Sequence, residues 1–147
     1  GSSVFAYGQK PDDSPWKVAV TDPRDTEGEY LGAITIEGGE FLSTSGDYEK
    51  YFMEDGKRYH HIFDPATGYP ADSGLRGVTV IDPCSTKADA LTTALFVMGL
   101  DKGMKFCEEN EIAAVFITSD KQVYTTSKTG DCTFEFLGEK KGYTYAE

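Results

Sequence analysis

Short stretches of alternating apolar and polar residues run along most of this chain, separated by glycine, proline and acidic residues. Alternation with a period of two is typical of a β-strand that buries one face. Val4, Phe5 and Tyr7 indicate a first strand. Further strands are predicted at 16–20, within 31–46, within 49–63, and at 77–82, 112–118, 121–127 and 132–137. The sequence therefore predicts a protein built mainly from strands.

Two glycine-containing turns predict β-hairpins. Gly38-Gly39 divides the segment 31–46, and Asp55-Gly56 divides the segment 49–63. Both dipeptides tolerate the positive φ angles of tight turns. The strand at 121–127 is expected to form a third hairpin with the buried strand at 112–118. The segment 21–30 is predicted to be a polar loop, and the tail after residue 137 is polar with no predicted element.

The apolar period changes between residues 85 and 110, where two helices are predicted. STKADALTTALFVMG, residues 85–99, indicates a helix that ends at Gly99. Ser85 or Thr86 is the expected N-cap, and Thr86-x-x-Asp89 resembles a capping box. A shorter helix is predicted at 101–110. The fold class is therefore α+β, a mostly antiparallel sheet with a helical layer packed on one face, and residues 1–147 are predicted to form one domain.

The first helix lacks the charged face that most surface helices show. No charge follows Asp89 until Asp101, so we expect this helix to be buried on most sides. Asp89 and Thr93 are one turn apart on one face and offer hard oxygen ligands suited to Mg²⁺ or Ca²⁺. The structural alternative is that Asp89 caps its own helix while Thr93 bonds to the carbonyl of residue 89.

Two further segments contain candidate functional residues. STSGDYE, residues 43–49, is either a plain loop or a place where backbone N–H groups approach an anion, with Ser45 and Gly46 as the candidates. His60 and His61 are adjacent, and neighbouring side chains on a strand point to opposite faces. One imidazole is therefore expected to face inward and the other outward. His61 is either an acid–base group or a histidine with a purely structural role.

Charge and cysteine content narrow the choice of function. The chain has 14 Lys and Arg against 25 Asp and Glu, a net charge of −11. This balance argues against a nucleic-acid partner, because no basic stripe is present. A phosphorylated ligand would therefore need a local positive source, such as a divalent cation. The three cysteines form no C-x-x-C pair, which argues against a zinc site, and no apolar run reaches the length of a membrane span.

Four segments, in this order, resemble the ApbE family of flavin transferases. They are GSSVFAYGQKPDDSPWKVAVTDPR, FLSTSGDYEKYF, RYHHIFDPATGYPA and GVTVIDPCSTKADALTTALFVMG. The last two are similar to the family motifs H-I-x-D-P-x-T-G-x-P and A-D-A-L-[ST]-T-A. The resemblance covers nearly all of this chain but only about the C-terminal half of the family's length.

The resemblance implies an enzyme that binds FAD with Mg²⁺ and transfers FMN to a Thr or Ser hydroxyl of an acceptor protein, releasing AMP. It implies that Asp89 and Thr93 hold the metal and that His61, with Ile62 beside it, lies against the flavin nucleotide. His61 is then a candidate to orient the phosphate or to accept a proton, and His60 faces away from the site. The resemblance also implies a bacterial cell-envelope location.

Two other functions stay open at this point. Some similar proteins hydrolyse FAD to FMN and AMP, so a Mg²⁺-dependent FAD pyrophosphatase is one alternative. A non-catalytic module that binds flavin or nucleotide is the other, because the resemblance leaves out the family's upstream half.

Overall fold

A six-stranded sheet forms the centre of the molecule. The computed structural model describes residues 3–24, 28–36, 38–131 and 133–146. The central sheet has the strand order β1-β4-β7-β8-β9-β11, and every pair is antiparallel except β9 with β11. Its strands are β1 (Ser3–Ala6), β4 (Glu40–Gly46), β7 (Leu75–Asp82), β8 (Ala113–Thr118), β9 (Gln122–Thr125) and β11 (Thr144–Ala146).

A smaller sheet covers one face of the central sheet. It consists of β2 (Trp16–Thr21), β3 (Tyr30–Ile36) and β10 (Phe134–Phe136), with β3 in the middle. Apolar side chains of both sheets fill the space between them, including Leu31, Ile34, Val115 and Val123. Two short 3-10 helices, η1 (Ser127–Asp131) and η2 (Glu139–Lys141), lie in the connections that follow β9 and β10.

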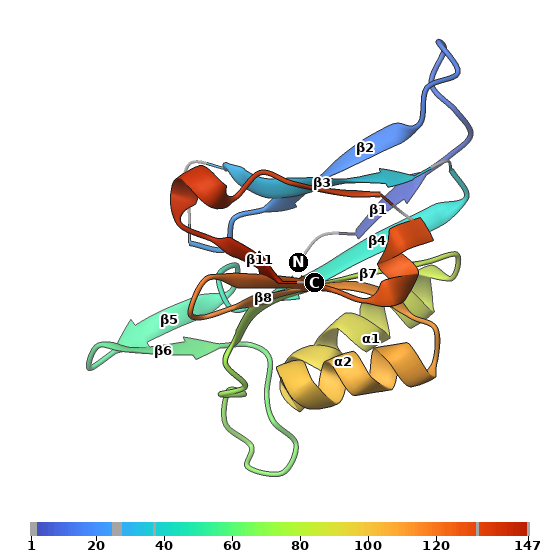
Figure 1. Cartoon of the computed structure of the whole chain (residues 1–147). Coiled ribbons are helices and arrows are strands. Elements are labelled where there is room, and N and C mark those ends of the chain that lie inside the picture. The colour runs from blue at the N-terminus through green and yellow to red at the C-terminus, as the bar shows by residue number, and fades with distance from the viewer. Residues whose placement is uncertain (1–2, 25–27, 37, 132, 147) are drawn as a thin grey trace.

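Two helices cover the opposite face, as Figure 1 shows. They are α1 (Ser85–Met98) and α2 (Leu100–Glu109). Leu95 and Phe96 of α1 pack with Val78 and Val80 of β7 in a second apolar core. The prediction of an α+β fold with a helical layer on one face of a mostly antiparallel sheet is confirmed. Gly99, at φ 78°, ends α1 as expected.

The hairpin predicted at 49–63 is also present. It consists of β5 (Tyr51–Glu54) and β6 (Lys57–His60), which pair only with each other among the described strands and project from the body of the molecule (Figure 1). Asp55 and Gly56 have φ angles of 50° and 77°, as a tight primed turn requires. The hairpin of β8 with β9 forms as well.

Two expectations about local structure, the Gly38-Gly39 hairpin and the N-cap of α1, were wrong. The Gly38-Gly39 turn does not close a hairpin, because β3 already has β2 and β10 on its two edges and the chain crosses to the central sheet. The polar tail after residue 137 contains η2 and one further strand, β11, which is too short to show an alternating pattern. The N-cap of α1 is Cys84, without a side-chain cap hydrogen bond, so no capping box forms.

A buried hydrogen bond ties the C-terminal segment to the smaller sheet. The Tyr143 hydroxyl donates to a carboxylate oxygen of Asp22 at 2.7 Å, and the two residues are 4% and 5% exposed. Burial, then this bond, raises the pKa of Tyr143 well above its ordinary range. Within the described part of the chain, neither helix has the length and apolar character needed to cross a membrane.

We predict that Tyr143→Phe lowers the free energy of unfolding by about 1–3 kcal/mol, because it leaves a buried carboxylate short of one donor. Urea denaturation followed by circular dichroism measures this change. Tyr7→Phe is the control, since Tyr7 is 81% exposed. Equal midpoints for Tyr143→Phe and the wild-type chain would contradict the role given to this bond.

Candidate functional site

Strand β4 and helix α1 bring four oxygen-bearing side chains together. Ser43 and Ser45 lie two positions apart on β4 and therefore share a face of the strand. Asp89 and Thr93 lie four positions apart on α1 and share a face of the helix. The Ser43 hydroxyl donates to Oδ1 of Asp89 at 3.3 Å, and the hydroxyls of Ser45 and Thr93 are 3.3 Å apart. We call these four residues the hydroxyl–carboxylate cluster.

The cluster lies at the boundary between a buried and an exposed part of α1. Ala88, Thr92, Leu95 and Phe96 form the buried stripe of the helix. Asp89 and Thr93 are exposed, and so are Ala90 and Ala94 beside them. The expectation that α1 is buried on most sides was wrong. The alanines explain the error. A helix face that carries alanines has no charged side chains, but alanine is small enough to remain exposed to solvent at little cost.

Thr92 connects the cluster to the core, although it is not among the predicted site residues. Its side chain is fully buried, its hydroxyl donates to the carbonyl of Asp89 at 2.8 Å, and it lies 2.8 Å from the Ser45 hydroxyl. The structural alternative expected Thr93 to bond to the carbonyl of residue 89, but Thr92 makes this contact instead. The signal that could have indicated Ser43 and Thr92 is the density of hydroxyls in STS and LTTA.

The segment STSGDYE does not start as a loop. Residues 43–46 belong to β4 and pair with β7, with Ser45 opposite Val78 and Gly46 opposite Gly77. Gly46 is buried next to Tyr48, so a side chain at this position would collide with the tyrosine ring. The expectation of a loop is therefore wrong for residues 43–46, and the assignment of Ser45 and Gly46 to nucleotide binding stays a prediction.

The two histidines face opposite sides, as the alternation predicted. His60 is 7% exposed, contacts the Ala71 carbonyl through Nε2 at 3.1 Å, and accepts a hydrogen bond from the Ile62 N–H at Nδ1. Its ring packs edge-on against Phe96 of α1. Burial lowers the pKa of His60 below its ordinary value of 6.5, although the Ala71 carbonyl opposes the shift. His60 is therefore a structural residue.

His61 is exposed, and its Nδ1 lies 3.3 Å from the Lys50 carbonyl. A carbonyl oxygen can only accept, so a hydrogen bond here needs the proton on Nδ1, and in the neutral imidazole Nε2 is then the acceptor. Ile62 is 2% exposed and packs in the core with Leu95 and Phe96. Its side chain is therefore part of the core, and the assignment of Ile62 to nucleotide binding stays a prediction.

The structure joins some predicted site residues and separates others. Ser45, Asp89 and Thr93 belong to one cluster. No hydrogen bond in the described ranges links His61 to that cluster, and no group of three or more His, Cys, Asp or Glu residues there is placed to hold a metal ion. The cluster therefore offers a metal one carboxylate and neighbouring hydroxyls, and further ligands would have to come from outside it.

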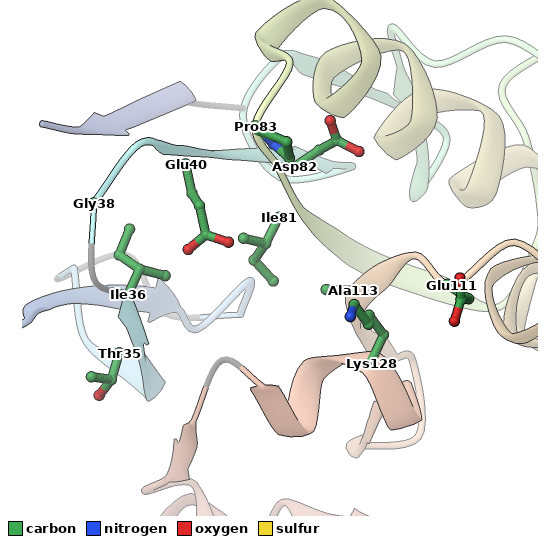
Figure 2. Close-up of a pocket in the computed structure, with 10 residues that line it drawn as sticks. All are labelled: Thr35, Ile36, Gly38, Glu40, Ile81, Asp82, Pro83, Glu111, Ala113 and Lys128. Atoms are coloured by element: carbon green, nitrogen blue, oxygen red, sulfur yellow. The ribbon is translucent and has the colours of Figure 1, made fainter.

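A cavity of about 420 Å³ lies elsewhere, where the two sheets meet, and none of the predicted site residues lines it. Figure 2 shows the Glu40 carboxylate between Ile36 and Ile81, while Asp82 points away toward the start of α1. Asp82 is paired there with Lys87 at 2.6 Å and accepts from the Cys84 N–H. This acidic cavity is therefore not the site that the motifs predict.

Comparison with known proteins identifies the family. The model of the ApbE family matches residues 1–116. The chain belongs to the ApbE family. Curated ApbE relatives include the FAD:protein FMN transferases of Haemophilus influenzae, 36% identical over 141 residues, and of Klebsiella pneumoniae, 41% identical over 128 residues. These matches cover 96% and 86% of this chain.

Solved structures of ApbE proteins have the same fold. The protein from Thermotoga maritima superposes with a TM-score of 0.72 at 37% identity over 96% of this chain. The flavin transferase from Vibrio cholerae gives a TM-score of 0.75 at 32% identity over 90% of this chain. The chain spans only 40% and 38% of the two curated relatives and 42% of each of these structures. It therefore corresponds to less than half of the proteins that it resembles.

We predict that Thr92→Val destabilises the chain by about 1 kcal/mol or more, because it removes two hydrogen bonds from a buried position. Thr93→Val and Asp89→Ala should change the free energy of unfolding by less than about 0.5 kcal/mol, because both side chains are exposed and neither caps the helix. Chemical denaturation measures all three. A large loss of stability in Asp89→Ala would restore the capping explanation.

We also predict that stability falls as the pH drops from about 7 to about 5.5, in part through His60. The folded-state pKa of His60 lies below the ordinary value of 6.5. As the pH falls, the unfolded chain therefore binds a proton at this histidine before the folded chain does, which lowers the free energy of the unfolded state relative to the folded state. Urea midpoints across this range should fall less steeply for His60→Gln, with His61→Gln as the matched control. An unchanged slope in His60→Gln would contradict this assignment.

Proposed function

We propose that this chain is part of a Mg²⁺-dependent FAD:protein FMN transferase, which moves FMN from FAD to a Thr or Ser hydroxyl of an acceptor protein and releases AMP. The observation that supports this most directly is the hydroxyl–carboxylate cluster, which gathers hard oxygen ligands on an open surface of an ApbE-family chain. An acidic protein that handles a diphosphate needs such a cation site.

The cluster is chemically suited to magnesium. Asp89 and Thr93 would be the protein ligands, with Ser43 and Ser45 holding the two side chains through the contacts at 3.3 Å. Mg²⁺ commonly uses one or two carboxylates and completes its shell with water and substrate phosphates, so one carboxylate is enough. When bound, it would supply Lewis-acid stabilisation of charge on the diphosphate oxygens.

His61 is suited to accept a proton. In the proposed reaction, the acceptor hydroxyl oxygen bonds to the FMN phosphorus and the bond from that phosphorus to the bridging oxygen breaks. AMP leaves with the bridging oxygen and its electron pair. The hydroxyl proton would pass to Nε2 of His61, because Nδ1–H is engaged by the Lys50 carbonyl. Loss of a general base commonly slows a reaction by ~10²–10⁴-fold.

Two alternatives differ from transfer in what happens to the flavin. Water in place of the acceptor hydroxyl would give a Mg²⁺-dependent FAD pyrophosphatase. The other alternative is a module that binds flavin or nucleotide without turnover, and it is supported by the extent of the match, because this chain spans only 40% and 38% of the two curated relatives. The location in the bacterial cell envelope stays a prediction from the family.

We expect FAD and Mg²⁺, supplied to a protein of the relatives' full length that includes this chain, to yield AMP and acceptor-bound flavin. Chromatography follows AMP, and fluorescence of the denatured acceptor follows bound FMN. Asp89→Ala should abolish both products, and His61→Ala should slow both by ~10²–10⁴-fold. Asp101→Ala, which removes an exposed carboxylate from α2, is the matched control.

Each alternative gives a different pattern in this assay. AMP without labelled acceptor identifies a pyrophosphatase, and FAD binding without AMP identifies a binding module. Full activity of Asp89→Ala would contradict the proposed role of the cluster. The 147-residue chain is assayed in parallel, so that any activity of this part alone is measured directly.

A further inference from the structure

A second cavity, separate from the hydroxyl–carboxylate cluster, opens between β6 and the segment 69–76. Its volume is about 310 Å³. Polar and apolar groups both line its walls, and neither Asp89, Thr93 nor His61 contributes to them. The charged and hydroxyl-bearing residues that line it include Asp47, Lys57, Arg58, Asp72, Ser73 and Arg76.

Asp47 is the buried group of this cavity, with 1% of its surface exposed. Arg76 donates to its Oδ2 atom. Arg58 lies 3.7 Å from Oδ1, which is an ion-pair distance but too long for a hydrogen bond. Among the described residues, Oδ1 of Asp47 has no hydrogen-bond partner, and neither has the buried Oγ of Ser73. A buried polar atom that lacks a partner costs free energy.

The charge around the cavity is opposite to that of the molecule. Three cations, Lys57, Arg58 and Arg76, outnumber the carboxylates of Asp47 and Asp72, whereas the chain as a whole carries −11. Arg58 and Arg76 keep about a third of their side chains exposed. Guanidinium groups arranged in this way bind oxyanions.

A ligand of this cavity must meet two requirements at once. It must offer acceptor oxygens to the arginines and Lys57, and it must donate a hydrogen bond to Oδ1 of Asp47. We propose that the cavity binds a monoprotonated phosphate group, either free phosphate or a phosphate monoester. Such a group has both acceptor oxygens and one O–H donor bonded to the same phosphorus atom. Sulfate at neutral pH has no proton to donate.

Two other possible occupants, an amino acid and water alone, fit the cavity less well. An amino-acid zwitterion has both a donor and a carboxylate, but its ammonium group would add a fourth cation beside Lys57, Arg58 and Arg76. Water alone would satisfy Oδ1 of Asp47 and Oγ of Ser73 but would leave the excess positive charge unbalanced. The phosphate assignment does not depend on the proposed flavin transfer, because the two sites share no residue.

The test is a titration of the folded 147-residue chain with inorganic phosphate, sulfate, AMP and glycine, followed by calorimetry and by amide chemical shifts. Phosphate should bind saturably, with chemical-shift changes at Asp47, Ser73 and Arg76. The affinity for sulfate should be lower than that for phosphate by about tenfold or more, because one charge-assisted hydrogen bond is lost. Tighter binding of AMP than of phosphate would identify a nucleotide monoester as the source, and the reverse would identify free phosphate.

Variants separate this site from general charge effects. Ser73→Ala removes a hydroxyl that has no described partner, so it should preserve the fold and weaken phosphate binding severalfold. Lys57→Gln should also weaken binding, whereas Lys105→Gln, which removes an equal charge from α2, should not. The proposal is overturned if phosphate binding does not saturate, if sulfate binds equally well, if glycine binds more tightly, or if Ser73→Ala has wild-type affinity.

Discussion

The central constraint on this structure is that β7 and β8 are buried on both faces. Every residue of β8 is buried, and only one residue of β7, Arg76, is even partly exposed. Strands of this kind need a covering layer on each side. The small sheet supplies one and the helices supply the other. Because α1 must lie over β4 and β7 to do this, the oxygens of Asp89 and Thr93 come to lie against the serines of β4.

This arrangement explains how a site can form with little cost to the fold. Thr92, one residue from Thr93, is fully buried and bonded to β4. Thr92 therefore fixes the helix, while Asp89 and Thr93 at its edge are free to contact a ligand. The same division applies to the adjacent histidines, since His60 is anchored in the core and His61 is directed outward.

Features set by local chemistry could be predicted from the sequence. The Asp55-Gly56 turn, the stop at Gly99, the opposed histidines and the spacing of Asp89 and Thr93 all follow from residue type and period. Features set by distant partners could not. The Gly38-Gly39 segment has the composition of a hairpin turn, but β10, about a hundred residues away in sequence, occupies the edge that β4 would need. Nothing near Asp89 indicates that Ser43 lies beside it.

The last described residues, 133–146, place β10 in the small sheet and β11 in the central sheet. One short segment therefore completes both layers, and Tyr143 between its two strands locks it to Asp22. Contacts of such long sequence separation slow folding, because distant parts of the chain must meet before they stabilise each other. During synthesis on the ribosome, β3 and β9 therefore each keep one unpaired edge until this segment has emerged.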